Sequence, residues 1–521
     1  MKNNKKMSLL FVVIIMMVVS FTFTGFSQEL AKELIIAVTD EIEGTDAQTI
    51  GKMNLAHDCM YDNLITESKD GKSYLPQACE SYTVSDDGLT WTFVFPEGAK
   101  FSNGDPFDAE AVKASFERMR EVGEYAGLIE NVKEFKVVDK QTLAMILEVF
   151  DPVFELTLCQ GQMGVVDAKV AKEIGDDAFK TETIAYGVLA LDEWVHGSHV
   201  TFKPNPYYTN RCPDVENKGP INFEKVTVRF IPDSFTIISE LEQGTIDITR
   251  PVPLESVESL RANPDIKLYE TETTGGVLIY MNTKDPVLSD IRIRQAITLG
   301  IDREEIASAL NGFVSPSFTF MAPSTNSFSP EKEQEMAMKW ATNHEKAAAL
   351  LEEAGWVSKG KDGIREKDGE KLSIEMQTAS DVNTIKLAAP IIQKQLKEIG
   401  IDLKIRELEH AYVKANAREG KYQLATRSVE WIDPIHAVAF STNSNYYSNE
   451  KLDKLINDAH FTAGREARIK AFELVTDEMF EQMPAVSLFY GITFTASRAN
   501  IEGLWITKSF ATKLVDVKKY K

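Results

Sequence analysis

The sequence predicts an α/β protein, and two stretches of the chain carry that prediction. In the C-terminal half, alternating apolar runs at residues 372–376 and 401–405 flank an amphipathic stretch at residues 383–399. A strand, a helix and a strand at this spacing form a parallel crossover unit. In the N-terminal half, a β-rich run at residues 89–95 precedes a helical pattern that begins after Asp108. Because strands and helices are interleaved in both halves, the expected class is α/β with α+β parts.

The N-terminal stretch begins with the β-prone residues 89–95, which enter a turn at Pro96-Glu97-Gly98. A second turn follows at residues 104–106, and the Asp108 carboxylate is then placed to cap a helix. The inward face of this helix is predicted to carry three apolar residues: Val112, Phe116 and Met119.

Residue patterns mark the strands and the helix end of the crossover unit in the C-terminal half. Its two strands alternate apolar with polar residues: Leu372, Ile374 and Met376 in the first, and Ile401, Leu403 and Ile405 in the second. Gly400 stands where a left-handed residue ends a helix, and Pro390 is a candidate kink. A further helix at about residues 345–354 ends at Gly355 in the same way. The buried face of the 383–399 helix is expected to comprise Leu387, Ile391, Ile392, Leu396 and Ile399.

Length and charge narrow the class of function. The chain has 521 residues, enough for three or four domains of about 150 residues each. It is 43% apolar and 26% charged, which is typical of a globular protein. Its formal net charge is −22 at pH 7, with a sequence pI near 4.9. Such an acidic surface argues against nucleic acid and anionic membrane as main partners, and leaves small molecules, cations and other proteins.

The first 27 residues have the pattern of an export signal. Lys2, Lys5 and Lys6 form a basic segment before the unbroken apolar run at residues 9–19. Small residues at positions 25 and 27 fit cleavage before Gln28. A retained membrane anchor is the alternative, but it needs about 18 or more apolar residues. No cysteine lies near the cleavage position, so the sequence predicts a periplasmic protein without a lipid anchor.

Four cysteines are present in the chain: Cys59, Cys79, Cys159 and Cys212. Their spacing contains no C-x-x-C pair, so a zinc cage is not expected. In an oxidising compartment they could form up to two disulfides, with three possible connectivities, and buried free thiols are the alternative.

No catalytic motif emerges from the sequence. Residues 355–361 fit G-x-x-x-x-G-K, but they follow a helix, and Asp362 replaces the hydroxyl that a nucleotide-binding loop uses for magnesium. His196 and His199 flank the turn of a hairpin predicted at residues 194–202, where two surface imidazoles are the simplest interpretation. No cofactor and no metal ligand set is expected.

Seven stretches of the chain, taken in order, resemble the extracytoplasmic solute-binding proteins of ABC transporters, in the peptide- and nickel-binding group called family 5. The longest match joins residues 85–93 (SDDGLTWTF) to residues 101–113 (FSNGDPFDAEAVK). The other stretches lie at residues 34–38, 205–208 (NPYY), 241–247 (LEQGTID), 280–283 (YMNT), 291–303 (with IRIRQAI and IDR) and 483–490 (MPAVSLFY). One departure is residues 185–189, where AYGVL replaces the group's tight glycine turn, so a different local geometry is expected there.

The resemblance implies a two-lobed periplasmic-binding-protein fold of the class II type, built from three chain regions, with a ligand cleft between the lobes. Lobe closure is then a hinge motion, without a chemical reaction. The implied partners are a peptide or small-molecule ligand and the permease subunits of an ABC importer, with no nucleic acid and a monomeric state. The implied domains after the signal peptide are domain I (28–62, 205–275 and 495–521), domain II (63–204) and domain III (276–494).

The resemblance also implies where the ligand lies. In this group, a strand just before an acidic-Pro dipeptide runs along the ligand, and here it is residues 426–434 (TRSVEWIDP). Glu430 matches the position of the Asp that receives a peptide α-ammonium in peptide-binding members, and Trp431 would form a wall. The alternative is a solvated Glu430 and a core Trp431. The expected ligand-binding residues are Arg427, Ser428, Glu430, Trp431 and Asp433.

Three ligand or function classes stay open from the sequence. The loop at residues 377–382 lacks the Arg that dipeptide binders use, so a longer peptide or another amine-bearing solute is favoured over a fixed dipeptide. Arg427, Asp433-Pro434 and His436 resemble the pattern of nickel-chelate binders, which keeps a metal chelate as the alternative. An exported hydrolase is the third class, although no nucleophile–base pair is evident.

Overall fold

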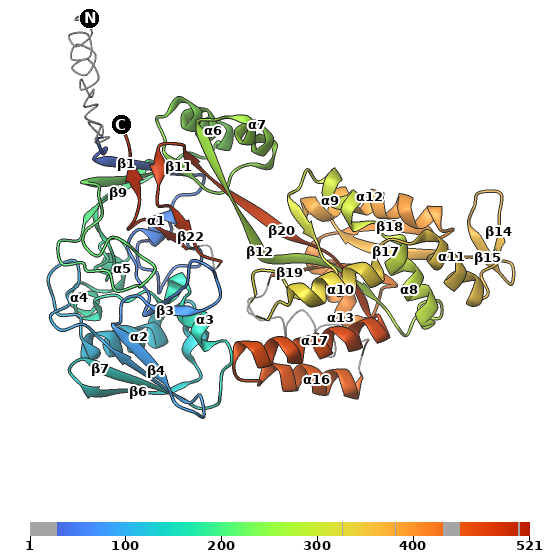
Figure 1. Cartoon of the computed structure of the whole chain (residues 1–521), viewed down its shortest axis with the longest axis horizontal. Coiled ribbons are helices and arrows are strands. Elements are labelled where there is room, and N and C mark those ends of the chain that lie inside the picture. Colours follow the sequence, from blue (N-terminus) through green and yellow to red (C-terminus); the bar gives the residue numbers. More distant parts are fainter. Residues whose placement is uncertain (1–28, 326, 381, 431–446, 448, 509–510) are drawn as a thin grey trace, which may run out of the picture.

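The computed structural model describes residues 29–325, 327–380, 382–430, 447, 449–508 and 511–521. Two lobes are visible in Figure 1, joined by a pair of long strands that run from one lobe into the other. We call residues 29–272 with 492–521 the first lobe, and residues 276–490 the second lobe. The predicted signal peptide at residues 1–27 lies outside the described residues.

One sheet runs through both lobes, in the strand order β18-β17-β19-β12-β20-β11-β1-β10-β9-β8, with β13 also paired to β20. Its long members β12 and β20 are antiparallel and belong to both lobes. The strands of this sheet are β1 Glu33–Val38, β8 Leu189–Val195, β9 His199–Pro204, β10 Lys225–Phe230, β11 Ile248–Thr249, β12 Ile266–Met281, β13 Val314–Pro316, β17 Ser373–Ala379, β18 Asp402–Leu408, β19 Leu424–Glu430 and β20 Ala485–Arg498.

The first lobe adds a small antiparallel sheet, β4-β5-β7-β6, which is covered by α2. Asp108 caps α2 by accepting a hydrogen bond from the Ala111 amide, and the three predicted inward residues are fully buried. Its helices are α1 Leu55–Asp58, α2 Ala109–Val122, α3 Phe154–Leu158, α4 Ala168–Ile174, α5 Asp176–Phe179, α6 Ser234–Gln243 and α7 Val257–Ala262. Its short strands are β2 Ile65–Glu67, β3 Tyr74–Pro76, β4 Ser81–Val84, β5 Thr90–Val94, β6 Val132–Asp139, β7 Thr142–Leu147, β21 Ile501–Glu502, β22 Trp505–Ile506, β23 Thr512–Lys513 and β24 Lys518–Lys519.

The second lobe contains the predicted crossover unit, which is confirmed: β17 and β18 pair in parallel on either side of α12, and Gly400 ends the helix at φ +93°. Its helices are α8 Ile291–Gly300, α9 Arg303–Ala309, α10 Pro330–Trp340, α11 His344–Glu353, α12 Asn383–Glu398, α13 His410–Glu419, α16 Glu450–His460 and α17 Arg465–Gln482. A three-stranded appendage comprises β14 Ser358–Lys359, β15 Arg365–Lys367 and β16 Glu370–Lys371.

One predicted core position in α12 is wrong. Leu387 is 60% exposed, although the sequence places it on the buried face. The buried stripe begins at Ile385 and continues through Ala388 and Ile392. Two positions after Ile385 lie about 200° around the helix, so Leu387 faces away from the sheet.

The described residues form three hydrophobic cores, which fall on different parts of the chain. The largest combines residues 34–248 with residues 501–517, the second lies within residues 277–490, and a third forms around α6, α7 and β20 where the lobes meet. The predicted boundaries of domains I, II and III remain a prediction. All four cysteines are buried and free.

The departing segment at residues 185–189 is packed tightly. A Cβ added to Gly187 would lie 2.0 Å from the Met60 carbonyl oxygen, so only glycine fits there. Tyr186 stacks on Phe107 with ring centroids 3.9 Å apart. The segment therefore keeps its one essential glycine and replaces the rest of the turn with buried apolar side chains.

Candidate functional site between the lobes

The hinge between the lobes is a break in the β12–β20 ladder. Regular pairing runs from Ile266 to Glu272 and resumes at Gly276 opposite Tyr490. A Cβ on Gly276 would lie 2.5 Å from the Tyr490 ring, so this crossing requires glycine. Breaks of this kind bend a strand and increase its twist. The two crossing strands therefore bend at the point where the lobes join.

Strand β19 brings the predicted ligand strand to this break. It is antiparallel to β12, with Arg427 opposite Leu278, Ser428 opposite Val277 and residue 430 opposite Gly275. Successive residues of a strand point to opposite faces, so Arg427 and Ser428 lie on different sides of the sheet. Of the other predicted site residues, Trp431 and Asp433 lie outside the described residues.

Arg427 is a buried cation, and two of its nitrogen donors have no hydrogen-bond partner among the described residues. It is only 8% exposed, and its guanidinium lies 5.6 Å from the centre of the Tyr280 ring. Its Nε and Nη1 have no hydrogen-bond partner among the described residues. Burial raises the pKa of Tyr280, and the charge of Arg427 opposes that rise. The Oγ of half-buried Ser428 is likewise unpartnered within the described part of the chain.

The hinge also carries groups that the sequence did not single out. Partial burial raises the pKa of Glu272, and Lys508 of the C-terminal segment opposes this. The Lys508 amide in turn donates to Glu67 Oε2 over 2.8 Å, while the Glu67 Oε1 atom is buried without a hydrogen-bond partner among the described residues. These three residues lie far apart in the sequence, and no motif connects them. Only the folded chain brings them together.

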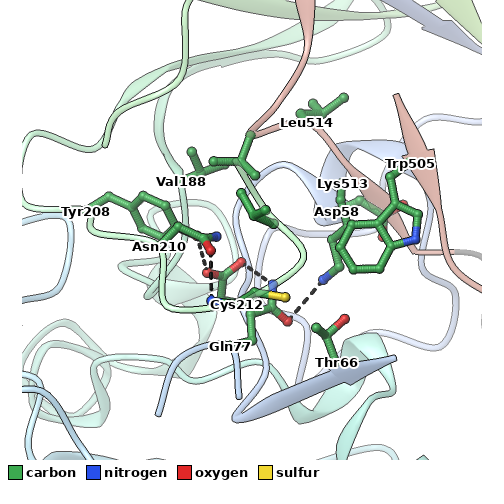
Figure 2. Close-up of a pocket in the computed structure, with 13 residues that line it drawn as sticks. Asp58, Thr66, Gln77, Val188, Tyr208, Asn210, Cys212, Trp505, Lys513 and Leu514 are labelled. Atoms are coloured by element: carbon green, nitrogen blue, oxygen red, sulfur yellow. Dashed lines mark hydrogen bonds between the residues drawn. The ribbon is translucent and has the colours of Figure 1, made fainter. Parts of the chain in front are cut away.

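The first lobe also contains a small pocket with several polar side chains in its lining (Figure 2). Asp62 accepts hydrogen bonds from Gln77 and from the Tyr208 hydroxyl, both at 2.6 Å. Lys513, from the C-terminal segment, donates to the Gln77 side-chain oxygen at 3.1 Å. Burial raises the pKa of Asp62, and Lys513 opposes this. These hydrogen bonds join the C-terminal segment to the rest of the first lobe.

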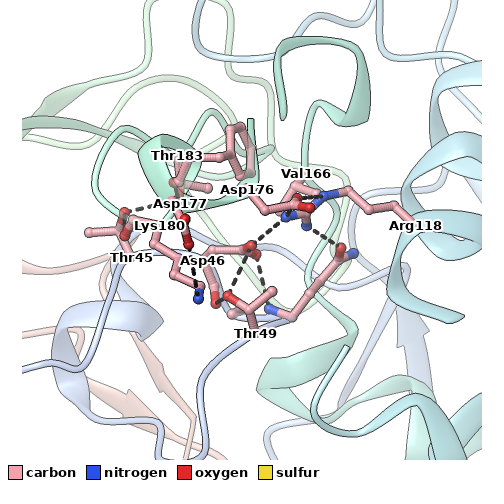
Figure 3. A network of polar contacts seen from close by, with 12 residues as sticks. Thr45, Asp46, Thr49, Arg118, Val166, Asp176, Asp177, Lys180 and Thr183 are labelled. Carbon is pink, nitrogen blue, oxygen red and sulfur yellow. Dashed lines mark hydrogen bonds and ion pairs between the residues drawn. The ribbon is translucent and has the colours of Figure 1, made fainter. Parts of the chain in front are cut away.

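A second network fixes the loop after β1 (Figure 3). Arg118 of α2 donates to Asp46 Oδ2 and to Asp176 Oδ1, both at 2.7 Å, and to Gln48 at 2.8 Å. The Asp46 side chain is fully buried, and that of Arg118 is 9% exposed. A buried ion pair with this many additional hydrogen bonds holds its geometry firmly. It sets the position of the loop that leaves the first strand.

The lobes also touch away from the hinge. Arg468, in the first turns of α17, donates to the Pro152 carbonyl oxygen of the first lobe at 3.3 Å. In Figure 1, the end of α17 lies beside the region of α3. Within the described ranges, no three His, Cys, Asp or Glu side chains gather closely enough to hold a metal ion.

Residues 73–451 match the family model for bacterial extracellular solute-binding proteins, family 5 (middle). The chain belongs to this family. As a family 5 protein it is related to the nickel-binding periplasmic protein of Escherichia coli K12, with 27% identity over 406 residues and 74% of each chain. The oligopeptide-binding protein AppA of Bacillus subtilis 168 is 24% identical over 474 residues, which cover 85% of this chain and 83% of that relative.

A solved structure shows the same fold. HbpA2 from Haemophilus parasuis superimposes with a TM-score of 0.81 at 20% identity, over 94% of this chain and 100% of that chain. The expected two-lobed α/β fold is therefore confirmed, as is the resemblance drawn from the sequence. None of the helices in the described residues is both long and apolar enough to span a bilayer.

Proposed function

We propose that this protein is the exported solute-binding component of an ABC importer, and that it captures oligopeptides or related amine-bearing solutes between its two lobes. Membership of family 5 is the observation that carries the proposal. An oligopeptide-binding relative that matches 85% of the chain supports the ligand class. The break in the β12–β20 ladder supplies the bend that hinged closure needs.

In this proposal, Glu430 receives the ligand's ammonium. Its position at the end of β19, opposite Gly275 at the hinge, supports this role. An ammonium that loses its water needs a fixed counter-charge, and one charge-assisted hydrogen bond contributes about 1.5–3 kcal/mol. We place Trp431 and Asp433 at the same end of the ligand. Arg427, with two unpartnered donors, is assigned to a ligand carboxylate.

The second candidate is a metal chelate, favoured by the nickel-binding relative at 27% identity. A chelate with free carboxylates would also suit Arg427. His436 belongs to this alternative and lies outside the described residues. The two candidates therefore share Arg427 and differ at Glu430, because only an amine-bearing ligand needs its charge.

Binding without turnover completes the proposal. The family consists of solute-binding proteins, and we expect no hydrolysis of peptides or glycosides by the purified chain. We also propose that residues 1–27 are removed on export, that the mature protein is a periplasmic monomer, and that nucleic acid is not a partner.

Mass spectrometry of the small molecules released on denaturing freshly purified protein tests the ligand class. A set of short peptides is the expected result. A single non-peptide species, or a stoichiometric metal with an organic chelator, contradicts the peptide proposal and favours the second candidate.

Calorimetry with a ligand so identified tests the assignment of Glu430. Glu430→Gln should lower the affinity by about tenfold or more, which follows from the energy of one charge-assisted bond. Glu407→Gln is the matched control, since Glu407 is an exposed carboxylate on β18. Equal affinity of the two variants would remove Glu430 from the site.

A further inference from the structure

Arg303, the first residue of α9, is one of the most deeply buried charges of the second lobe. It is 2% exposed, and its guanidinium lies 4.7 Å from the centre of the Phe318 ring. Its Nε donates to the Ser487 carbonyl oxygen at 2.7 Å. Neither Nη1 nor Nη2 has a hydrogen-bond partner among the described residues. A buried polar group without a partner is costly, so these donors call for an acceptor.

Two further polar groups lie on or bond to the segments that contact Arg303, namely β20 through Ser487 and the chain at Phe318. Tyr490 of β20 is 2% exposed, and its hydroxyl also lacks a partner among the described residues. Glu333 of α10 is held in place by the Phe318 amide and the Thr319 hydroxyl, both at 2.6 Å. Burial raises the pKa of Glu333, and Arg303 opposes this. Glu333 acts electrostatically on both Arg303 and Tyr490, although no described residue accepts a hydrogen bond from either Arg303 Nη atom.

We propose that Arg303, Glu333 and Tyr490 form an internal water site, in which one or more ordered waters join the guanidinium to the carboxylate and the phenol. A buried water needs two to four polar partners, and this cluster offers them. The Nη atoms and the Tyr490 hydroxyl act as donors, and Glu333 acts as the acceptor. The bridging water satisfies donors that have no hydrogen-bond partner among the described residues.

Charge decides between water and a small anion at this site. Arg303 and Tyr490 alone would attract an anion, but the fixed Glu333 carboxylate repels one. Burial lowers the pKa of Arg303 to about 10, so it is still protonated at neutral pH. The cluster is therefore close to neutral when Glu333 is ionised, and a neutral ligand with both donor and acceptor capacity fits it best.

The Tyr490 residue of this site is next to the break in the β12–β20 ladder. Tyr490 is the residue of β20 that pairs with Gly276, directly after the break in the ladder. Its ring fills the space left by the missing Gly276 side chain, and β13 pairs with it on the other edge. The bridged waters thus anchor β20 where it enters the second lobe, and leave the bending to the residues beyond it.

Crystallography of the full chain, at a resolution that shows ordered water, tests the proposal directly. We expect density within hydrogen-bonding distance of an Arg303 Nη atom and the Tyr490 hydroxyl, and no anomalous peak there after a bromide soak. The absence of density between these groups overturns the proposal. A bromide peak also overturns it, because the site would then bind an anion.

Oxygen-17 relaxation dispersion tests the same site in solution by counting long-lived internal waters. Tyr490→Phe and Arg303→Met each remove donors from the cluster, and at least one of them should lower the count by one or more. Tyr412→Phe is the control, since Tyr412 is 62% exposed. A count equal to that of the wild type in both cluster variants contradicts the proposal, whatever their stability.

Discussion

The buried arginines of the two lobes, Arg118 and Arg303, differ in their hydrogen-bond partners. In the first lobe, Arg118 is paired with two carboxylates and an amide, and every one of these bonds is 3.2 Å or shorter. In the second lobe, Arg303 makes one bond to a backbone carbonyl and has no acceptor for either Nη atom among the described residues. The comparison teaches that burial alone does not measure what a charge contributes. The contribution of a buried charge to stability depends on the partners that the chain provides for it.

The largest effect should come from removing Arg118. Arg118→Met leaves Asp46 buried without its cation, and we expect the free energy of unfolding to fall by about 3–5 kcal/mol. Urea denaturation followed by circular dichroism measures it. Lys113→Met, on the exposed side of the same helix, removes a surface pair with Glu117 and should change stability by only about 0.5 kcal/mol. Equal losses in the two variants would contradict the paired interpretation of the first lobe.

Asp62, a buried carboxylate with hydrogen-bond partners, should make the stability of the fold depend on pH. Burial raises its pKa in the folded state above the value of about 3.9 in the unfolded chain. Its contribution to stability is therefore fully present below the unfolded pKa, and is lost as the pH rises through the folded pKa. The advantage of the wild type over Asp62→Asn should shrink from acidic to neutral pH in urea titrations.

Asp87 provides the control with the opposite sign. Hydrogen bonds from Ser85 and the Leu89 amide lower the pKa of this exposed carboxylate. The advantage of the wild type over Asp87→Asn should therefore grow with pH through the acidic range. The same slope for both variants would rule out burial as the cause of the Asp62 shift.

The smallest effect should come from Arg303. Among the described residues, no side chain bonds its Nη atoms directly. Arg303→Met therefore loses one bond to a carbonyl and the proposed bonds to water, but it also relieves the cost of a buried charge, so we expect a change of about 1 kcal/mol or less. The same urea experiment as for Arg118→Met gives the comparison. A loss as large as that of Arg118→Met would show that the two arginines are equally paired.

Local patterns explain what the sequence could predict. The Asp108 cap, the crossover of β17, α12 and β18, and the glycines that end α11 and α12 depend on residues within one turn or one strand of each other. Leu387 was misplaced because an apolar residue at the edge of a periodic stripe can be assigned to either face. The buried face is set by which strand the helix covers, and that information is not local.

The candidate site depended more on contacts that are distant in the sequence. Arg427 and Ser428 lie on β19 as the family resemblance implies, but strand alternation places them on opposite faces. The partner of Arg427, Tyr280, and the hinge residue Glu272 both lie on β12, and Lys508 comes from the C-terminal segment. Gly276 alone carried a signal, since glycine inside an apolar strand indicates a close approach.

The path of the chain through β12 and β20 also has a consequence for assembly. The second lobe is one continuous stretch, whereas the core of the first lobe contains residues 501–517, which are made last. A chain that emerges from its N-terminus therefore lacks part of the first lobe's core until the second lobe has emerged. Its exposed apolar surface makes this interval the time when the protein most needs protection from aggregation. The lobe that begins the sequence is therefore the one whose core can be completed last.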